Sequence, residues 1–328
     1  MLLTQLPDEL PASFDRSRTY GTRGWTTFEW CSAELGAKPF SLGYAKWKLV
    51  IDVAADDGGA QRRLPTTPAR MATLLADCRF TNGADSSTVL TLYEKTAVAV
   101  LGNVESLDYS GLPLVRGDAW TSPVLLAETL NYCDSLRRLT VRGALLDDEG
   151  VAELAAGLED SALPALENLA IMANRFGARG AAALCDIFPR GVAPALKTLN
   201  ISFTRIGNEG AVALAAALKM GKPALTLSLR FCDVGNEGAM AIAAALPSAS
   251  KGCRVIAASI AANNRMGLAG QTALLQALEA KHGAQFMQAL SVSQMSFFPW
   301  LTPIKCARPH GRWGRGMRRV FESGQLIV

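Results

Sequence analysis

The chain has 328 residues, of which 49% are hydrophobic and 19% are charged, which is enough apolar material for a sizeable core and argues against wholesale disorder. The 33 basic and 29 acidic residues leave a net charge of +4, which is too small to indicate nucleic acid or a membrane as a partner. Two histidines, His282 and His310, exclude any site that needs three.

The seven cysteines are scattered, odd in number and without a C-x-x-C pair. This usage is typical of reduced thiols in the cytoplasm and not of a disulfide framework or a zinc site. No stretch reaches about 18 consecutive apolar residues, so we expect no transmembrane helix. The N-terminus carries Asp8 and Glu9 where a secretory leader would be apolar. We therefore expect a cytoplasmic protein, and the sequence indicates no cofactor and no metal.

Residues 1–100 predict a small and incomplete α/β region. The expected elements, in chain order, are a helix at 26–37, a strand at 48–53, a turn at 56–59, and helices at 68–78 and 86–100. The second of these helices follows Thr66-Thr67-Pro68, which has the cap-then-proline order of a helix start.

The segment from Thr22 to Glu29 reads T-R-G-W-T-T-F-E. It is similar to the R-x-W-C-x-x-E segment of Toll-interleukin-receptor (TIR) like domains and of related protist regulatory proteins. In the NAD-cleaving members of that class the glutamate is catalytic, so the resemblance implies that role for Glu29. Thr26 stands in place of the usual cysteine, and only 21 residues precede Thr22, fewer than the strand–helix units of that fold require. The residues alone suggest instead that Trp25 and Phe28 are core anchors and that Glu29 is a solvated helix residue.

A repeat dominates the middle of the chain. Three blocks share the pattern L-x-x-L-x-L and begin at Leu136, Leu166 and Leu196, and a fourth block holds Leu227 and Leu229. Glycines follow the strand patterns in steps of 30, 30 and 28 residues, at Gly150, Gly180, Gly210 and Gly238. A weaker fifth block holds Ile256 and Ile260. A degenerate block that precedes the others holds Val104, Leu107 and Tyr109. We count about six units across 101–284.

Each unit also has a helical half. Gly210, Leu214 and Leu218 recur every four residues and share one face of a helix, and the same face returns in the other units. One unit cannot bury its apolar side alone, whereas stacked units share a continuous core. The sequence therefore predicts an α/β solenoid, a horseshoe with a concave parallel sheet and a convex layer of helices.

The full pattern, L-x-x-L-x-L…N-x-I-G-x-x-G-A-x-A-L-A-x-A-L, resembles the ribonuclease-inhibitor type of leucine-rich repeat. The resemblance implies a horseshoe fold, in which an asparagine of each unit bonds the turn backbone. This asparagine matches at Asn174 and again near 263–264. Ala144 and Thr204 replace it in other units, and Cys232 is a common alternative in that family.

Side chains of a strand alternate between the core and the opposite face, so the register predicts which residues line the concave surface. The outward residues that we expect to bind a partner are Arg138, Thr140, Arg142, Asn168, Met172, Asn200, Ser202, Thr226, Ser228 and Arg230. Ala170 and Thr198 complete the set. The arginines favour a partner protein with an acidic patch. Between 136 and 246 the 11 basic and 11 acidic residues balance, which disfavours nucleic acid.

The chain lacks the P-loop, the dinucleotide-binding glycine loop, H-E-x-x-H and G-x-S-x-G. The carboxylate run 147–149 lies at a predicted helix start, where it favours the positive helix end, and Cys185 and Cys232 fall at core positions. We therefore predict a non-catalytic scaffold or regulator that binds a partner protein. Two alternatives remain open. They are a GTPase-activating regulator of the Ran-regulator type, which the repeat class implies, and a degenerate TIR-like NAD-cleaving enzyme that uses Glu29.

Residues 285–328 lie beyond the repeats. The aromatic stretch 296–300 is expected to cap the open end of the solenoid. Six lysines and arginines against the single acid Glu322 follow between 305 and 328. We interpret them as a partly disordered tail or as a weak contact site for an anionic partner.

Overall fold

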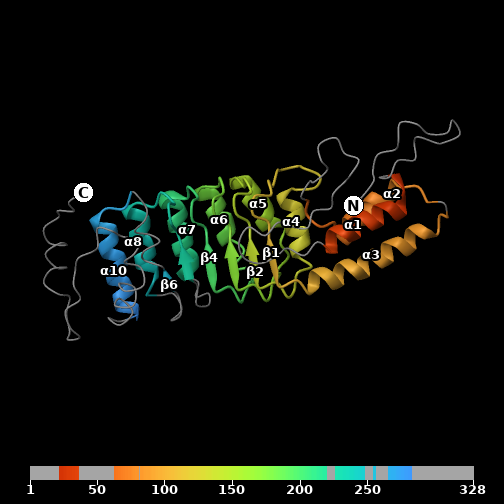
Figure 1. Ribbon diagram of the computed structural model, residues 1–328. Coiled ribbons are helices and arrows are strands. Elements are labelled where there is room, and N and C mark those ends of the chain that lie inside the picture. The colour runs from red at the N-terminus through yellow and green to blue at the C-terminus, as the bar shows by residue number, and fades with distance from the viewer. Residues whose placement is uncertain are drawn as a thin grey trace.

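The computed structural model describes residues 22–36, 63–80, 82–219, 226–247, 254–255 and 265–282. Figure 1 shows them as an elongated body. Three helices lie at the N-terminal end, and strand–helix units stack along the rest of the length, so that the strands form one layer and the helices another.

The N-terminal helices are α1 (Gly24–Gly36), α2 (Pro68–Ala76) and α3 (Asp85–Gly102). The three helices expected in this region are confirmed, each with boundaries within two residues of the prediction. Thr67 is the N-cap of α2, and its hydroxyl accepts a hydrogen bond from the backbone N–H of Arg70 (3.3 Å). The strand expected at 48–53 and the turn at 56–59 lie outside the described residues.

Within the described ranges, six parallel strands form one sheet in chain order. They are β1 (Ser106–Asp108), β2 (Arg138–Thr140), β3 (Asn168–Ala170), β4 (Thr198–Asn200), β5 (Thr226–Ser228) and β6 (Arg254–Val255). The helices that alternate with them are α4 (Pro123–Leu130), α5 (Asp148–Gly157), α6 (Ala178–Cys185), α7 (Gly207–Lys219), α8 (Asn236–Ala245) and α10 (Leu268–His282). The predicted α/β solenoid is confirmed.

The last strand, β6, lies immediately before Ile256, which the sequence pattern assigns to the weaker fifth block. Leu227 of β5 pairs with Val255, which therefore holds the position of the strand leucine. Valine suits a strand as well as leucine does, but a search for leucine spacing passes over it. Ile256, Ile260 and the tail 285–328 lie outside the described residues, as does the expected aromatic cap.

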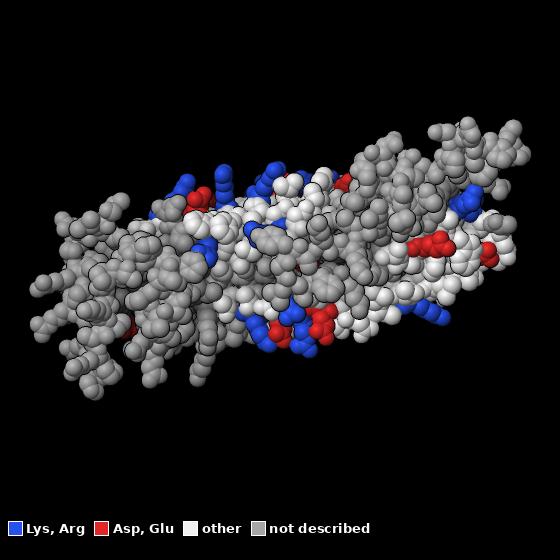
Figure 2. Space-filling model, viewed as in Figure 1, with Lys and Arg blue, Asp and Glu red and all other residues white. Residues whose placement is uncertain are grey.

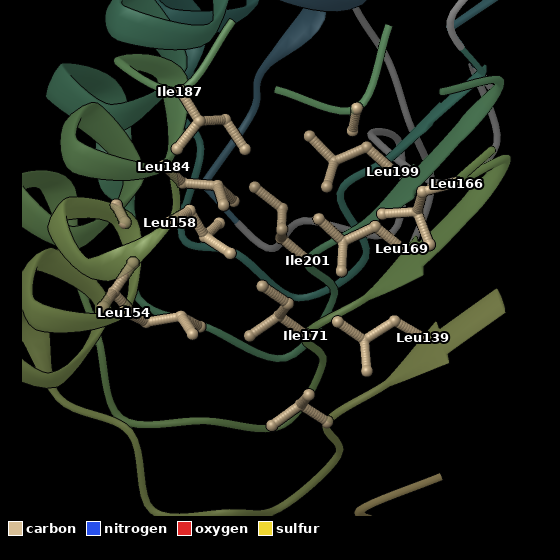
Figure 3. Packing of buried hydrophobic residues seen from close by; sticks show 14 of the residues in the cluster. Leu139, Leu154, Leu158, Leu166, Leu169, Ile171, Leu184, Ile187, Leu199 and Ile201 are labelled. Atoms are coloured by element: carbon tan, nitrogen blue, oxygen red, sulfur yellow. The ribbon is translucent and has the colours of Figure 1, made fainter. Parts of the chain in front are cut away.

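Apolar side chains fill the space between the sheet and the helices (Figure 3). Leu139, Leu169 and Leu199 from successive strands are at most 5% exposed, and they face Leu154 and Leu184 of the helices. The same positions recur in each unit, so the core is continuous and extends to α1 at one end and to α10 at the other. Strands of three residues can persist in this sheet because neighbouring units complete the burial that one unit cannot provide.

Asn174 is a buried polar residue that joins two turns. Its Oδ1 accepts the backbone N–H groups of Ala144 (2.9 Å) and Leu146 (3.2 Å), and its Nδ2 donates to the carbonyl of Val141 (2.7 Å). The expected bonding of the turn backbone by Asn174 is confirmed. Thr204, at the same position of the next unit, donates to the carbonyl of Ile201 (2.6 Å) and shares a weak hydrogen bond with Cys232 Sγ (3.8 Å).

The N-terminal helices continue the core of the repeats. The backbone N–H of Leu64 donates to the carbonyl of Trp120 (3.1 Å), and the buried hydroxyl of Tyr93 donates to the carbonyl of Thr66 (2.6 Å). The helices therefore cover the side of the first unit that has no preceding repeat, as a terminal cap does in a solenoid.

Candidate functional site

The register of the sheet arranges the predicted partner-binding residues in rows. Paired residues form a first row across four strands: Arg138, Asn168, Thr198 and Thr226. A second row holds Thr140, Ala170, Asn200 and Ser228. A third follows two residues further along each chain segment: Arg142, Met172, Ser202 and Arg230. The residues chosen from the sequence thus come together on one face of the sheet.

The centre of this face is a compact hydrogen-bonded group. The hydroxyls of Ser202 and Ser228 share a hydrogen bond (3.1 Å), and Ser202 Oγ accepts the backbone N–H of Arg230 (3.1 Å). Asn200 Oδ1 accepts the backbone N–H of Ser202 (3.1 Å). Ser202 is 1% exposed and Ser228 is 9% exposed, so the prediction that these serines line an open surface is wrong. Small hydroxyl side chains can be buried here because they bond to one another and to the backbone.

Arg138 and Arg142 are exposed on the β2 side of the face. Neither forms an ion pair with a residue of the described ranges. Arg230, on the other side, is only half-exposed. A guanidinium group carries five N–H donors in a planar fork that fits a carboxylate. On the part of the face that the structure describes, the exposed arginines without an ion pair therefore lie on the β2 side.

At the beginning of the strands, neighbouring charges neutralise one another. Glu167 forms ion pairs with Lys197 (2.9 Å) and Arg137 (3.5 Å). The hydrogen bond from Lys197 is the main reason that the pKa of the Glu167 carboxyl lies below its ordinary value. Figure 2 shows charged side chains in groups along both long edges of the repeat region. Arg137 thus forms an ion pair with Glu167, whereas its neighbour Arg138 acts on the Glu167 carboxyl only through its charge.

Residues at both ends of the sheet extend the rows beyond the predicted set. Ser106 and Asp108 on β1, and Arg254 on β6, continue them through the register of the outermost strands. The sequence could have indicated Ser106 and Asp108, because Leu107 aligns with the strand leucine Leu139 and lies between them.

The segment that resembles TIR-like domains forms the start of α1. Gly24 packs so closely on Phe80 that a Cβ would lie 1.9 Å from the ring. Trp25 is 43% exposed, and its indole N–H donates to a carboxylate at the start of α3 (3.1 Å), so the prediction of Trp25 as a core anchor is wrong. Phe28 is partly buried against the core, as predicted, and Glu29 is exposed.

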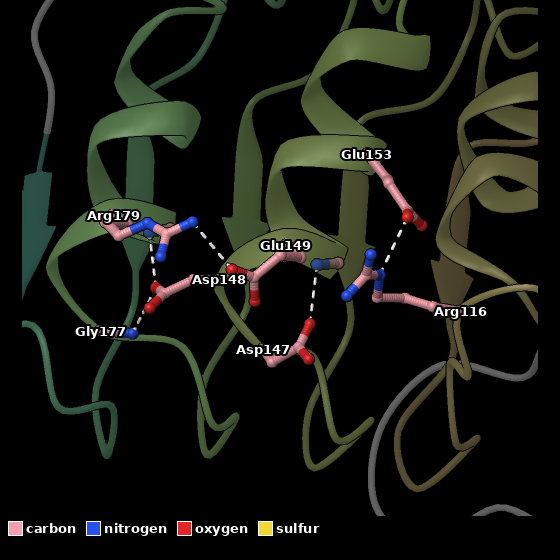
Figure 4. A network of polar contacts seen from close by, with 9 residues as sticks. Arg116, Asp147, Asp148, Glu149, Glu153, Gly177 and Arg179 are labelled. Carbon is pink, nitrogen blue, oxygen red and sulfur yellow. Dashed lines mark hydrogen bonds and ion pairs between the residues drawn. The ribbon is translucent and has the colours of Figure 1, made fainter.

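Carboxylates at a helix start bond the backbone of two repeats (Figure 4). Asp147 Oδ1 accepts the N–H of Gly150 in its own helix, α5 (2.7 Å). Asp148 Oδ1 accepts the N–H groups of Gly177 (2.7 Å) and Gly180 (2.6 Å) in the next repeat. The predicted helix-start role of this run is confirmed, and Asp148 adds a link between units.

Asparagine makes the same link in later repeats. Asn208 Oδ1 accepts the backbone N–H groups of Gly235 (2.8 Å) and Gly238 (3.1 Å). Asn236 Oδ1 accepts those of Gly267 (2.8 Å) and Gly270 (3.2 Å). Ala178 stands at this position on α6 and has no side-chain acceptor. The N–H groups of Gly207 and Gly210 bond to backbone carbonyls instead (both 3.0 Å). This side-chain link therefore joins α5 to α6 and α7 to α8, but it is missing between α6 and α7.

The buried thiols belong to the core. Burial raises the pKa of Cys133 and of Cys185 to about 12 and also raises that of Cys232. Such a thiol stays protonated at neutral pH and is a poor nucleophile. The prediction that Cys185 and Cys232 serve packing is confirmed by their burial, at 6% and 0% exposure.

The interior of the repeats is closely filled. The apolar void between Leu139, Leu169 and Leu184 has a volume of about 20 Å³, room for little more than one water molecule. Among the described residues, no cluster of three or more possible metal ligands occurs. No helix in the same ranges is long and apolar enough to cross a membrane.

Two stretches, 193–215 and 225–243, match the family model described as Leucine Rich repeat. The first contains β4 and the start of α7, and the second contains β5 and most of α8. A comparison with curated proteins gave no match. Together with the parallel sheet and its alternating helices, the two matched repeats support a leucine-rich repeat protein with an α/β solenoid fold.

Proposed function

We propose that the chain is a non-catalytic binding protein whose sheet face docks an acidic surface of a partner protein. The observation that carries the proposal is the pair Arg138 and Arg142, exposed and without an ion pair among the described residues. Backbone hydrogen bonds to the next repeat fix the main chain that carries both, so little backbone conformational entropy is lost when a partner binds. Extended repeat surfaces of this kind are typical protein-binding sites.

Two finer features belong to the proposal. The strand leucines Leu139, Leu169, Leu199 and Leu227 recur in steps of 30, 30 and 28 residues with one helix between them, which supports the ribonuclease-inhibitor type of repeat. The five described cysteines are free thiols, which supports a cytoplasmic location.

The alternative functions have weaker support. Glu29, the residue that a TIR-like enzyme would use, is exposed in the middle of α1. The idea of a GTPase-activating regulator of the Ran-regulator type rests on the repeat class alone, and a fold does not determine a function.

Affinity measurements on the full chain test the docking face. The baits are the parent chain, the variant Arg138→Glu/Arg142→Glu, and the control Lys95→Glu/Lys219→Glu, which changes the net charge equally at exposed helix positions. Proteins captured from lysate are identified by mass spectrometry, purified, and titrated against each folded bait by calorimetry.

The expected result is a partner whose Kd rises at least about tenfold for the arginine variant and changes less than about twofold for the control. Binding should also weaken with added salt, because the contact is between charges. Equal affinity of a partner for all three baits would contradict the proposed face.

A further inference from the structure

The turns that leave the strands repeat one unusual backbone conformation. The residue three positions after the end of the strand has a positive φ in five successive units: Gly111 (71°), Gly143 (62°), Ala173 (56°), Phe203 (61°) and Phe231 (53°). The backbone N–H of Phe203 donates to the carbonyl of Arg230 (2.7 Å), and Ala173 makes the equivalent bond to Ser202 (2.8 Å). Bonds between repeats therefore hold this conformation, which favours glycine.

Phenylalanine at two of these positions is unfavourable for the fold by itself. A bulky side chain at positive φ is strained, and glycine would meet the same backbone requirement without strain. Phe203 and Phe231 are also 49% and 45% exposed, so much of their apolar surface remains in water. Their rings stack, with centroids 5.0 Å apart and an angle of 24° between the planes. Strain combined with exposure in adjacent units points to a role in binding.

The same turns carry free positive charge. Arg205 follows Phe203 by two residues, and Arg175 holds the equivalent position one repeat earlier. Both are exposed and without an ion pair among the described residues. The equivalent position of the following repeat holds a carboxylate, Asp233, which is paired with Arg265 (3.7 Å). Successive turns thus carry two exposed aromatic residues and, two positions after this turn residue in their units, two exposed arginines without an ion pair among the described residues.

We propose that Phe203, Phe231, Arg175 and Arg205 form a docking site for an acidic segment of a partner protein that contains one aromatic or large aliphatic side chain. The side chain would pack on the phenyl rings, and flanking carboxylates would pair with the arginines. This site, the turn site, lies beyond the strand face that contains Arg138 and does not depend on the function proposed for that face.

A protein segment fits the turn site better than a nucleic acid. Two isolated rings, stacked on each other, form no series of platforms along which successive bases of a nucleic acid could stack. The 11 basic and 11 acidic residues between 136 and 246 also provide no continuous positive track for a phosphate backbone.

Fluorescence anisotropy with the full chain tests the turn site. The probes are a short peptide of Asp and Glu with one central Phe, the same peptide with central Ala, the Phe peptide with Lys in place of the acids, and a short oligouridine. The variants are Phe203→Gly/Phe231→Gly, Arg175→Glu/Arg205→Glu, and the matched control Ala173→Gly at the same turn position. Glycine suits the positive φ, so the first variant should keep the circular dichroism spectrum of the parent.

The acidic Phe peptide should bind the parent most tightly, and its Kd should rise at least about tenfold in the phenylalanine variant and in the arginine variant. The Ala173→Gly control and the variant Arg138→Glu/Arg142→Glu should bind it as the parent does, which separates the turn site from the strand face. Failure of the parent to prefer the acidic Phe peptide over the Ala peptide would overturn the proposal. So would unchanged affinity in the phenylalanine variant, or tighter binding of oligouridine at the same residues.

Discussion

The polar side chains at the helix starts and the arginines of the strand-end turns are placed in opposite ways in the repeats. At the helix starts, Asp148, Asn208 and Asn236 each give one side-chain oxygen to two backbone N–H groups of the next unit. At the turns, Arg175 and Arg205 are exposed and have no ion pair among the described residues. Groups engaged between units stabilise the stack, whereas exposed groups can bind a partner at little cost to it. Position in the repeat, more than residue type, therefore separates the residues that link units from those that we propose to bind a partner.

A charge placed in the core that the repeats share should lower the free energy of unfolding more than any other change considered. Leu199 is fully buried, and Leu199→Asp would place an unpaired carboxylate among strand leucines, at a cost of about 4 kcal/mol or more in the free energy of unfolding. Urea unfolding followed by circular dichroism measures the loss. Leu199→Met, of similar volume, is the control and should cost less than about 1.5 kcal/mol. A small loss for the Asp variant would argue against a continuous core.

The second largest effect is expected at Asn174. Asn174→Ala leaves the N–H groups of Ala144 and Leu146 and the carbonyl of Val141 without their side-chain partner, which should cost about 3 kcal/mol or more. Thr204→Val removes the hydrogen bond to the carbonyl of Ile201 and the weak one with Cys232 Sγ at the equivalent position, and should cost about 1 kcal/mol. Thermal unfolding of both variants gives the comparison. Equal losses would show that the extra bonds of the asparagine contribute nothing.

The helix-start link itself should show a chemical signature. Asp148→Ala removes both bonds to the next repeat and should cost about 2 kcal/mol, whereas Asp148→Asn should retain most of the stability because asparagine makes this link elsewhere. Both variants should keep the peptide affinity of the turn site. The assignment fails if the Asn variant is as unstable as the Ala variant.

The smallest effect is expected from the exposed ion pairs of Glu167. Its pKa is lower in the folded chain than in the unfolded one, first because of the hydrogen bond from Lys197. The stabilisation is therefore present above the unfolded value of about 4.3 and is lost as the pH falls through the folded pKa. Glu167→Gln should flatten this part of the curve of unfolding midpoint against pH. A curve parallel to that of the parent would show that Glu167 does not contribute to the pH dependence of stability.

The sequence predicted the repeating architecture because its determinants are local and recur. Leu139, Leu169 and Leu199 lie one repeat apart, and each is followed by an alanine-rich helical pattern. The same spacing predicted which residues share the outer face of the sheet. It did not predict the burial of Ser202, because alternation assigns a side but not the depth that hydrogen bonding with a neighbour such as Ser228 permits.

The contacts between repeats were the part that sequence reasoning missed. Asp148 was assigned to its own helix start, but its oxygen reaches Gly180, 32 residues later. The residue at this position changes among aspartate, alanine and asparagine, so no single letter marks it. Phe203 and Phe231 were passed over because a positive φ can be inferred for glycine but not for phenylalanine. Their shared offset with Gly143 was the available signal.

Because Ala178 has no side-chain acceptor, we expect the solenoid to open first at the interface between α6 and α7. In a chain of units that interact only with their neighbours, opening begins where the coupling is weakest. The helices α6 and α7 are joined by small apolar contacts, such as that of Gly210 with Ala178 and Ala181, whereas the flanking helix interfaces add a side-chain hydrogen-bonded link. Hydrogen exchange should therefore divide the repeats into two cooperative blocks at this interface. The turn site bridges that boundary, with Arg175 on one block and the two phenylalanines on the other, so an occupied site would fasten the blocks together.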